Sequence, residues 1–375
     1  MKPTKVHIVC FDVPYPADYG GAIDVFYKIK NLYTAGCKIY LHCFEYGRGL
    51  QPELNKYCEE VWYYPRITGL GGISTSIPYI VYSRRNKTLI SRLASIDAPI
   101  LFEGIHSTYY LSHPILKDRF KILRIHNIEH EYYLQLAQKE NNLLKKTYFL
   151  HESSLLEKYE HNLSSANAFC ALSMADHDYF KELYPFAHHN FIVPFHPYNE
   201  VVSLIGQGDY CLYHGNLSHP ENREAVFYLL KEIIPNLSCK VIIAGRQPAP
   251  DIVTAVKSTA NCQLIINPTS EELESLIQNA QINLLPTFQK SGMKLKLLYA
   301  LFAGRHAVAN RSMLHGTGLS DICPITDNSS EMIEKINSLF LFPFTTQDIE
   351  QRKQKLANYS NHNNALLLKQ LLLGN

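Results

Sequence analysis

Short apolar runs alternate with longer amphipathic stretches along most of the chain. Strand-like runs in the first half fall at residues 6–11, 38–43, 61–64, 100–102, 122–125, 168–172 and 191–193. A second series falls at residues 210–213, 240–243, 263–266, 282–285, 306–309 and 322–325. Helical patterns lie between these runs, and the longest covers about 128–165. Such alternation is typical of parallel sheets with helices on both faces, and it predicts an α/β protein with two doubly wound sheets.

Residues 194–209 separate the two series with two prolines and two glycines, a composition that suits a connection between domains. We place the boundary near Ser203, which gives an N-terminal domain of residues 1–203 and a C-terminal domain of residues 204–344. The remaining residues, 345–375, have a helical pattern, and a return onto the first domain is one course open to them. Doubly wound sheets bind ligands beyond the carboxyl ends of their strands. Two such domains would place those ends on either side of a cleft.

The stretch from residue 288 to 310 combines a glycine turn, an apolar helix and a second glycine before the next strand. Apolar side chains cover the helix most of the way round, which indicates burial. Its first turns nevertheless carry Lys294 and Lys296, although cations at a helix N-terminus oppose the macrodipole. A bound phosphate would resolve this conflict, because free backbone N–H groups also point there. The alternative is that both lysines extend into solvent.

Composition excludes several classes of protein. With 46% hydrophobic and 19% charged residues over 375 positions, the chain is an ordinary globular protein, long enough for two domains. A net charge of +2 gives no support for a general nucleic-acid-binding surface. No run approaches the roughly 20 apolar residues that cross a bilayer, and residues 1–10 lack the features of a secretion signal. Nine cysteines without a C-x-x-C pair fit a reducing compartment. We therefore expect a cytoplasmic protein.

Two strand-end loops of the first domain carry weak signals. Gly20 and Gly21 follow the first strand and allow the backbone to approach a ligand, although a plain tight turn explains them equally well. The G-x-G-x-x-G dinucleotide fingerprint is absent from this loop. Glu103 and His106 follow the strand at 100–102 and offer a carboxylate and an imidazole to a polar substrate.

A third loop is denser in polar groups. His126, Glu129 and His130 match the H-x-x-E-H pattern of zinc proteases, in which both histidines lie on one face of a helix. Here His126 falls at the end of a strand, so we favour a hydrogen-bonding or proton-carrying role on a sugar or phosphate. A satisfied structural histidine is the remaining alternative. Asn127, the next residue, adds a further polar group.

Three strand ends of the second domain contain glycine, and together they carry four cations. Gly215 and Asn216 follow one strand, and Gly245 and Arg246 follow the next. The third strand end adds Lys290, Ser291, Gly292, Met293, Lys294 and Lys296. Arginine binds phosphate as a planar fork and lysine as a point charge, so a diphosphate is the ligand that this set favours.

In this order the segments resemble the family 4 glycosyltransferases, retaining sugar-nucleotide enzymes with the GT-B fold of two facing Rossmann-like domains. The resemblance extends over nearly the whole chain and rests on residues 20–21, 123–133, 213–217, 220–222, 243–246, 291–296 and 303–305. It implies that the second domain holds a nucleotide-diphosphate sugar and the first holds a saccharide or lipid-linked saccharide. The expected setting is bacterial surface-glycan assembly, with peripheral contact at the cytoplasmic face of the inner membrane left open.

The resemblance also implies roles for single residues. Arg246 and Lys296 would neutralise the departing diphosphate while His126 lies near the sugar, which makes these three the expected catalytic residues. The expected donor-binding residues are Gly20, Gly21, Gly215, Asn216, Gly245, Ser291, Gly292, Met293, Lys294 and Tyr299. The expected acceptor-binding residues are Glu103, His106, Asn127 and Glu129. No metal, no other cofactor and no nucleic acid is expected.

One departure from the family concerns two glutamates separated by seven residues, at whose positions this chain has Ser291 and Tyr299. Hydroxyl groups can still form hydrogen bonds, and both lysines and Arg246 remain. We therefore favour an active hexosyltransferase, with retention implied by the resemblance alone. Alternatives are a binding relative that has lost turnover, a zinc hydrolase, and a sugar-nucleotide epimerase of the same fold.

A cluster of aromatic and basic side chains offers one surface for membrane contact, although a solvated loop is the commoner explanation. It consists of Tyr79, Tyr82, Arg84, Arg85 and Lys87.

Overall fold

The computed structural model describes residues 4–288 and 295–374. The chain divides into two compact units: unit 1 is Met1–Pro197 with Asn361–Asn375, and unit 2 is Tyr198–Ser360. Lys290, Ser291, Gly292, Met293 and Lys294 lie outside the described residues, so their predicted roles stay predictions.

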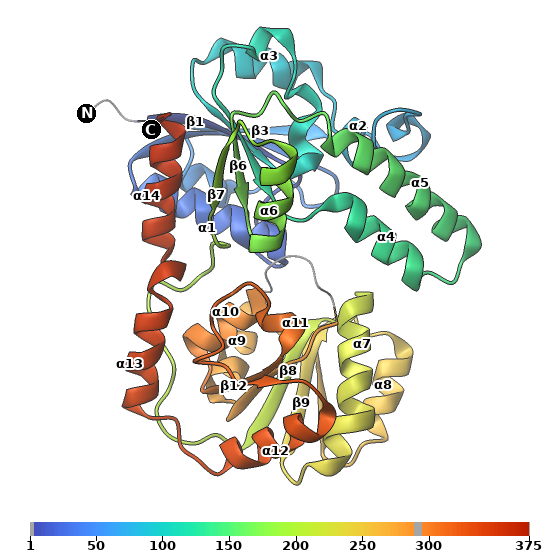
Figure 1. Cartoon of the computed structure of the whole chain (residues 1–375), viewed down its shortest axis with the longest axis vertical. Coiled ribbons are helices and arrows are strands. Elements are labelled where there is room, and N and C mark those ends of the chain that lie inside the picture. Colours follow the sequence, from blue (N-terminus) through green and yellow to red (C-terminus); the bar gives the residue numbers. More distant parts are fainter. Residues whose placement is uncertain (1–3, 289–294, 375) are drawn as a thin grey trace. The chain divides into compact units, whose positions relative to one another are not determined.

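Unit 1 is built on a seven-stranded sheet with the order β3-β2-β1-β4-β5-β6-β7 (Figure 1). Its strands are β1 (Thr4–Cys10), β2 (Cys37–Glu45), β3 (Glu60–Pro65), β4 (Ile100–Glu103), β5 (Lys121–Ile125), β6 (Ala168–Ala171) and β7 (His188–Phe191). All neighbouring strands are parallel. The strand order reverses between β1 and β4, so the loops that follow these strands separate at a point where doubly wound sheets bind ligands.

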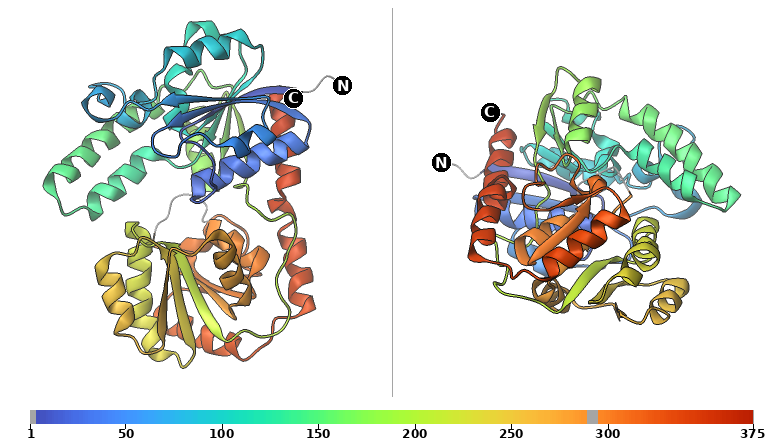
Figure 2. Two further views of the ribbon diagram at one scale, coloured as in Figure 1. Left: turned by 180° about the vertical axis from the view of Figure 1, so that it is seen from behind. Right: turned by 60° about the horizontal axis from the view of Figure 1, so that its bottom comes forward.

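Helices cover both faces of this sheet, and each face has its own apolar core. The helices are α1 (Gly20–Thr34), α2 (Tyr79–Tyr82), α3 (Lys87–Ser95), α4 (Glu129–Lys139), α5 (Leu143–Glu160), α6 (Met174–Leu183) and α14 (Asn361–Leu372). The last helix packs beside α1, as Figure 2 shows, and buries Ala365, Leu368 and Leu371 in the same core as Ile29. The end of the chain therefore completes the first sheet's cover.

Unit 2 has a six-stranded parallel sheet with the order β10-β9-β8-β11-β12-β13. Its strands are β8 (Tyr210–Asn216), β9 (Lys240–Arg246), β10 (Cys262–Ile266), β11 (Ile282–Leu285), β12 (His306–Asn310) and β13 (Ile325–Thr326). Its helices are α7 (Pro220–Tyr228), α8 (Pro250–Lys257), α9 (Ser270–Asn279), α10 (Leu295–Ala303), α11 (Arg311–Leu314), α12 (Ser329–Phe340) and α13 (Thr346–Lys355). Two doubly wound parallel sheets confirm the predicted fold class.

The unit boundary falls at Pro197 rather than near Ser203. The backbone N–H of Val202 donates to the carbonyl oxygen of Phe302 at 2.7 Å, and Ser203 accepts from Arg352 at 3.0 Å. These contacts join the connecting segment to α10 within unit 2.

A buried arginine fixes the far end of α10. Arg352 of α13 is 3% exposed and donates to the carbonyl oxygens of Leu301, at 3.1 Å, and of Gly304 and Arg305. Burial lowers the pKa of Arg352 to about 10, so the guanidinium stays charged at neutral pH. A cation at a helix C-terminus donates to free carbonyl groups and interacts favourably with the negative end of the macrodipole.

The predicted helical stretch at 128–165 is wrong as a single helix, because it is a hairpin of α4 and α5. The chain leaves α4 after Lys139, and Asn142 then caps α5 by accepting from the backbone N–H of Lys145 at 3.1 Å. An asparagine cap of this kind starts a new helix.

Two strands differ from their predicted positions. The strand predicted at 191–193 lies at His188–Phe191, where polar residues are tolerated because β7 is an edge strand. The strand predicted at 322–325 is reduced to Ile325–Thr326. The backbone N–H groups of Ile322 and Cys323 bond instead to the carbonyl oxygen of Leu319 in a turn.

Candidate functional site

Lys296 lies in the first turn of α10, and its ammonium group points back toward the sheet. It donates to Oδ1 of Asn222 at 2.8 Å and to the hydroxyl of Tyr213 at 3.3 Å, and it lies 4.7 Å from the centre of the Tyr213 ring. The alternative in which Lys296 extends into solvent is therefore wrong. The apolar helix that the sequence pattern predicted carries this cation to the end of β8.

Asn222 connects three elements of unit 2. From α7, its amide nitrogen donates to the carbonyl oxygen of Asn216 at 2.8 Å, while its amide oxygen accepts from Lys296 and from Tyr213, the latter at 3.0 Å. Sequence reasoning did not single out Asn222 or Tyr213 as site residues. The available signal was the Pro-Glu-Asn start of α7, directly after a glycine-containing strand end.

Arg246 ends β9 beside Asn216, because these two residues are register partners and Gly215 pairs with Gly245 one step earlier. A Cβ on Gly245 would lie 1.9 Å from the carbonyl oxygen of Gly215, so the two strands can approach this closely only with glycine here. The Arg246 side chain is exposed. We call Asn216, Asn222, Arg246 and Lys296 the strand-end cluster of unit 2.

His214 precedes the paired glycine of β8 and senses the charge of Lys296. Burial, and after it the charge of Lys296, lowers the pKa of the nearby His214 to about 3, so His214 stays neutral. His214 therefore adds no positive charge to those of Arg246 and Lys296. This arrangement suits a phosphate group.

Tyr299 follows Lys296 by three residues on α10, and its ring contacts Tyr198 edge-on at 5.3 Å between centroids. Its predicted contact with a donor ribose stays a prediction.

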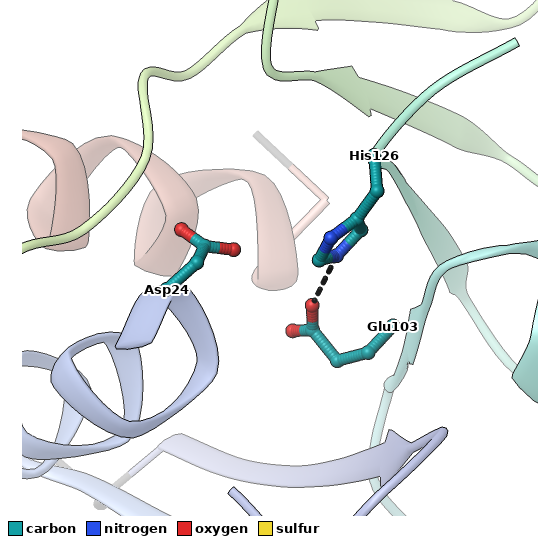
Figure 3. Close-up of side chains that lie close together, drawn as sticks. All are labelled: Asp24, Glu103 and His126. Carbon is teal, nitrogen blue, oxygen red and sulfur yellow. Dashed lines mark hydrogen bonds and ion pairs between the residues drawn. The ribbon is translucent and has the colours of Figure 1, made fainter. Parts of the chain in front are cut away.

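In unit 1, the switch point of the sheet contains a buried network of charges (Figure 3). Lys28 of α1 donates to both carboxylate oxygens of Glu103, at 2.7 and 2.8 Å, and to Asp24 at 2.9 Å. Arg124 of β5 pairs with the other oxygen of Asp24 at 3.2 Å. His126, just beyond β5, contacts Glu103 through Nε2 at 3.2 Å. We call these five residues the charge network of unit 1.

Both carboxyl groups of the charge network are ionised. Burial alone would raise the pKa of Asp24 and Glu103, but the positive charges of Arg124 and Lys28 hold the pKa of Asp24 well below its usual range. Lys28 and the hydrogen bond from His126 likewise lower the pKa of Glu103. An ionised carboxylate only accepts, so Nε2 of His126 is the donor in this contact.

His126 is the member of the network that reaches the surface. Its side chain is 11% exposed, whereas those of Glu103, Lys28 and Arg124 are 0% exposed and that of Asp24 is 2% exposed. The phenyl ring of Phe11 contacts His126 edge-on at 5.4 Å. The network therefore fixes the position of one accessible imidazole.

The charge network does not fit a metal ion. Ligand atoms of Asp24, Glu103 and His126 lie within 4.8 Å of one another. The ammonium group of Lys28 already contacts both carboxylates, and a divalent cation would have to displace it and leave a buried lysine unpaired.

The zinc-protease interpretation of the H-x-x-E-H stretch is wrong. His126 precedes α4 and contacts Glu103, whereas His130 lies inside α4 and contacts Glu160 at 2.6 Å. Although burial alone would lower the pKa of His130, that hydrogen bond and the charge of Glu160 raise it. The two histidines thus belong to different clusters.

Two predicted acceptor contacts need correction. Glu103 is fully buried and Glu129 is 3% exposed, so neither carboxyl group offers a surface to a saccharide. Burial, and then the charge of Glu160, raises the pKa of Glu129 to about 8, so it is largely protonated at neutral pH. His106 and Asn127 are half-buried, and their acceptor contacts stay predictions.

Gly20 and Gly21 begin α1, which has no side-chain cap on its first backbone N–H groups. A Cβ on Gly21 would lie 2.7 Å from the ring of Phe11, the same ring that packs against His126. Gly21 therefore supports the position of Phe11, a role that the sequence did not reveal. The contact of both glycines with the donor stays a prediction.

Arg84 does not belong to a membrane surface. It is 2% exposed and donates to the carbonyl oxygen of Phe11 at 2.7 Å and to the hydroxyl of Tyr46 at 3.3 Å. Its role is to hold the loop after β1. Across residues 4–288 and 295–374, no helix combines the length and the apolar character that a bilayer span requires.

Solved structures of similar fold span both units. Sucrose-phosphate synthase from Thermosynechococcus elongatus superimposes with a TM-score of 0.72 at 13% identity, covering 99% of this chain and 98% of that one. A mutant of S. aureus TarM in complex with Fondaparinux, alpha-GlcNAc-glycerol and UDP gives 0.66 at 12% identity and covers 100% of both chains. A glycosyltransferase from Rickettsia africae gives 0.66 at 13% identity, covering 100% and 99%. The fold is GT-B.

Two sequence comparisons are consistent with this GT-B fold. Residues 208–340, most of unit 2, match the family described as glycosyl transferases group 1. A Klebsiella pneumoniae protein described as an uncharacterized 44.6 kDa protein in the cps region is 26% identical over 332 residues, covering 84% of both chains.

Proposed function

We propose that the protein is a retaining glycosyltransferase that moves a hexose from a nucleotide-diphosphate sugar to a saccharide or lipid-linked saccharide. The family match over residues 208–340 supports glycosyl transfer, and the relative from a cps region supports a place in surface-glycan assembly. The reaction would take place in the cytoplasm, where the cytoplasmic face of the inner membrane is one place for it. No metal takes part in the proposed mechanism.

The observation that carries the proposal is the strand-end cluster of unit 2. Breaking the anomeric bond leaves an oxocarbenium-like sugar and a diphosphate whose negative charge grows in the transition state. Asn222 and Tyr213 hold the Lys296 ammonium in place before any substrate binds. Arg246 enters the same strand end beside Asn216. Cations fixed in advance stabilise the departing charge without reorganisation.

On the acceptor side, the proposal gives His126 a positioning and hydrogen-bonding role. Glu103 accepts from Nε2, so in the neutral imidazole Nδ1 can accept a hydrogen bond from a sugar hydroxyl. No carboxylate of the charge network is placed as a nucleophile, since Lys28 occupies both. Retention would then proceed on the front face of the sugar, within an ion pair.

Nucleotide binding tests the donor site directly. A thermal-shift screen of UDP, GDP, ADP and their sugars should find one base that raises the melting temperature, because a ligand of the folded state stabilises it by mass action. Lys296→Met and Arg246→Gln should each weaken that shift at least tenfold in ligand concentration. Lys257→Met removes an exposed lysine from α8 and serves as the control. Unchanged binding in both site variants would contradict these assignments.

Product analysis separates the remaining alternatives. A transferase releases the nucleoside diphosphate and extends the acceptor, whereas an epimerase interconverts the donor sugar without extending any acceptor. A binding relative that has lost turnover would give the thermal shift and neither product. Mass spectrometry of donor, acceptor and nucleotide pools over a panel of sugar nucleotides distinguishes all three.

A further inference from the structure

The α4–α5 hairpin extends from unit 1 and ends in a tip formed by residues 140–146, which Figures 1 and 2 show from several sides. Two adjacent leucines at this tip are largely in solvent: Leu143 is 78% exposed and Leu144 is 84% exposed. Tyr148 and Leu150, further along α5, are 41% and 44% exposed. The free hairpin thus presents an apolar end to water.

These leucines do not serve the folding of the hairpin. The two helices pack through other residues, of which Ala137 of α4 and Leu156 of α5 are fully buried. The rings of Tyr133 and Phe149 meet at 6.0 Å between them. Polar residues would start α5 equally well after the Asn142 cap. An exposed apolar end of this kind marks a surface that another body covers.

The charges beside the leucines indicate what that body is. Lys145 and Lys146 follow directly, and in the part of the chain that the structure describes no carboxylate forms an ion pair with either. The nearest acid at the tip, Glu140, accepts from the backbone N–H of Asn142 at 2.8 Å. An apolar end with adjacent cations is complementary to an anionic lipid surface, where leucine enters the interface and lysine meets the phosphates.

We propose that the hairpin tip, residues 140–146, docks on an anionic bilayer. Leu143 and Leu144 enter the boundary between head groups and acyl chains, and Lys145 and Lys146 contact lipid phosphates. The purpose of this contact rests on the proposed function, since it brings a lipid-linked acceptor near His126. The 11 residues of α4 separate the tip from the His126 loop by about 16 Å.

Vesicle binding by the full chain tests the proposal. Wild type should sediment with vesicles that contain phosphatidylglycerol and much less with pure phosphatidylcholine. Leu143→Ser with Leu144→Ser should weaken binding to the anionic vesicles at least tenfold. Lys145→Glu with Lys146→Glu should abolish the preference for anionic lipid and its dependence on salt. All four side chains lie at the tip, so melting temperatures should not change.

Matched controls come from unit 2. Leu341→Ser with Phe342→Ser removes another adjacent exposed pair, 74% and 60% exposed, and Lys231→Glu with Lys257→Glu repeats the charge change. Both controls should bind vesicles as wild type does. Equal losses in tip and control variants, or no binding by wild type, would overturn the proposal. So would a tip-leucine variant that changes the oligomeric state but still binds vesicles, because the tip would then cover a second copy.

The two proposals fail separately. Lys296→Met should lose nucleotide binding and keep vesicle binding, and the tip variants should do the reverse. A chain that transfers sugar but ignores vesicles overturns the docking proposal alone. A chain that binds vesicles but no nucleotide overturns the proposed function alone.

Discussion

The charge network of unit 1 and the strand-end cluster of unit 2 both place cations near the carboxyl ends of parallel strands. The partners of these cations differ between the two units. In unit 1, Lys28 and Arg124 are buried and paired with Asp24 and Glu103. In unit 2, Lys296 donates to the amide oxygen of Asn222 and to the hydroxyl of Tyr213, which are both neutral groups. Paired cations fix a neighbouring side chain, whereas cations held by neutral groups keep their attraction for a ligand.

Removing the central cation of unit 1 should have the largest effect. Lys28→Met leaves two carboxylates buried near a single guanidinium, so we expect unit 1 to lose about 3–5 kcal/mol of stability. Urea denaturation of the full chain, followed by a probe in unit 1, measures the loss.

The matched control is Lys38→Met, which breaks an ion pair whose side chains are 41% and 42% exposed. Such a pair contributes only about 0–1 kcal/mol. Similar losses of stability in the two variants would show that the buried network contributes no more than an exposed ion pair.

Placing a carboxylate beside Lys296, as unit 1 places carboxylates beside Lys28, should have the next largest effect. Asn222→Asp places a carboxylate at the 2.8 Å contact with Lys296, which cancels its charge and repels a phosphate. We expect nucleotide affinity to fall about 10- to 100-fold, or about 1.4–2.8 kcal/mol, measured by calorimetry.

Asn222→Ala is the comparison, since it also loses the donation to the carbonyl oxygen of Asn216, and it removes the contact with Lys296 instead of adding a charge to it. Its affinity should lie between those of wild type and Asn222→Asp. If both variants bind equally, charge compensation does not explain the difference between the units.

A third test concerns Glu129, a buried acid that lies outside the charge network. Its pKa rises from 4.5 to about 8, so between these values the folded state keeps a proton that the unfolded state loses. The contribution of Glu129 to stability is then highest below pH 4.5 and falls as pH rises toward 8. Glu129→Gln should remove this slope and add about 1–3 kcal/mol at pH 8, read from denaturation curves at several pH values.

Asp24 and Glu103 predict the opposite slope, because their depressed pKa values make their contribution complete above their unfolded values, 3.8 and 4.5. That contribution is lost as pH falls further. A Glu129→Gln profile as steep as wild type between pH 4.5 and 8 would count against its assignment.

The smallest effect is expected at Gly21. In Gly21→Ala the added methyl group meets the Phe11 ring at 2.7 Å, and a ring at the end of a side chain can move, so the stability loss should be about 1 kcal/mol. Because that ring packs against His126, transfer activity should fall more than nucleotide binding does. Equal changes in transfer activity and in nucleotide binding would show that Phe11 does not position His126.

The parts of the fold that the sequence predicted are those whose pattern is local. Buried strands such as β1 and β9 are built around short apolar runs, so their positions could be found from the local sequence. The edge strand β7 is polar, and the break between α4 and α5 depends on the cap at Asn142, so both were misjudged. Periodicity carries no signal for either feature.

The residues of the candidate site also divide into those that local sequence could predict and those that it could not. Arg246 and Lys296 follow glycine-containing strand ends, so the strand-end rule placed them on neighbouring elements. The contacts of Glu103 with Lys28 and of Asp24 with Arg124 join residues 75 and 100 positions apart. Spacing along a sequence does not reveal such pairs, which is why Glu103 was predicted to touch an acceptor rather than to hold His126.

The buried guanidinium of Arg352 sets a lower limit on how far this protein can be shortened. The segment that aligns with the glycosyl transferases group 1 family stops at residue 340 and starts at residue 208. It therefore omits both Arg352 and its partner Ser203, which anchor the carbonyl end of the helix that carries Lys296. A fragment cut at the limits of the family match would leave that helix end without the contacts of Arg352, whereas a fragment of residues 198–360 would keep the whole of unit 2.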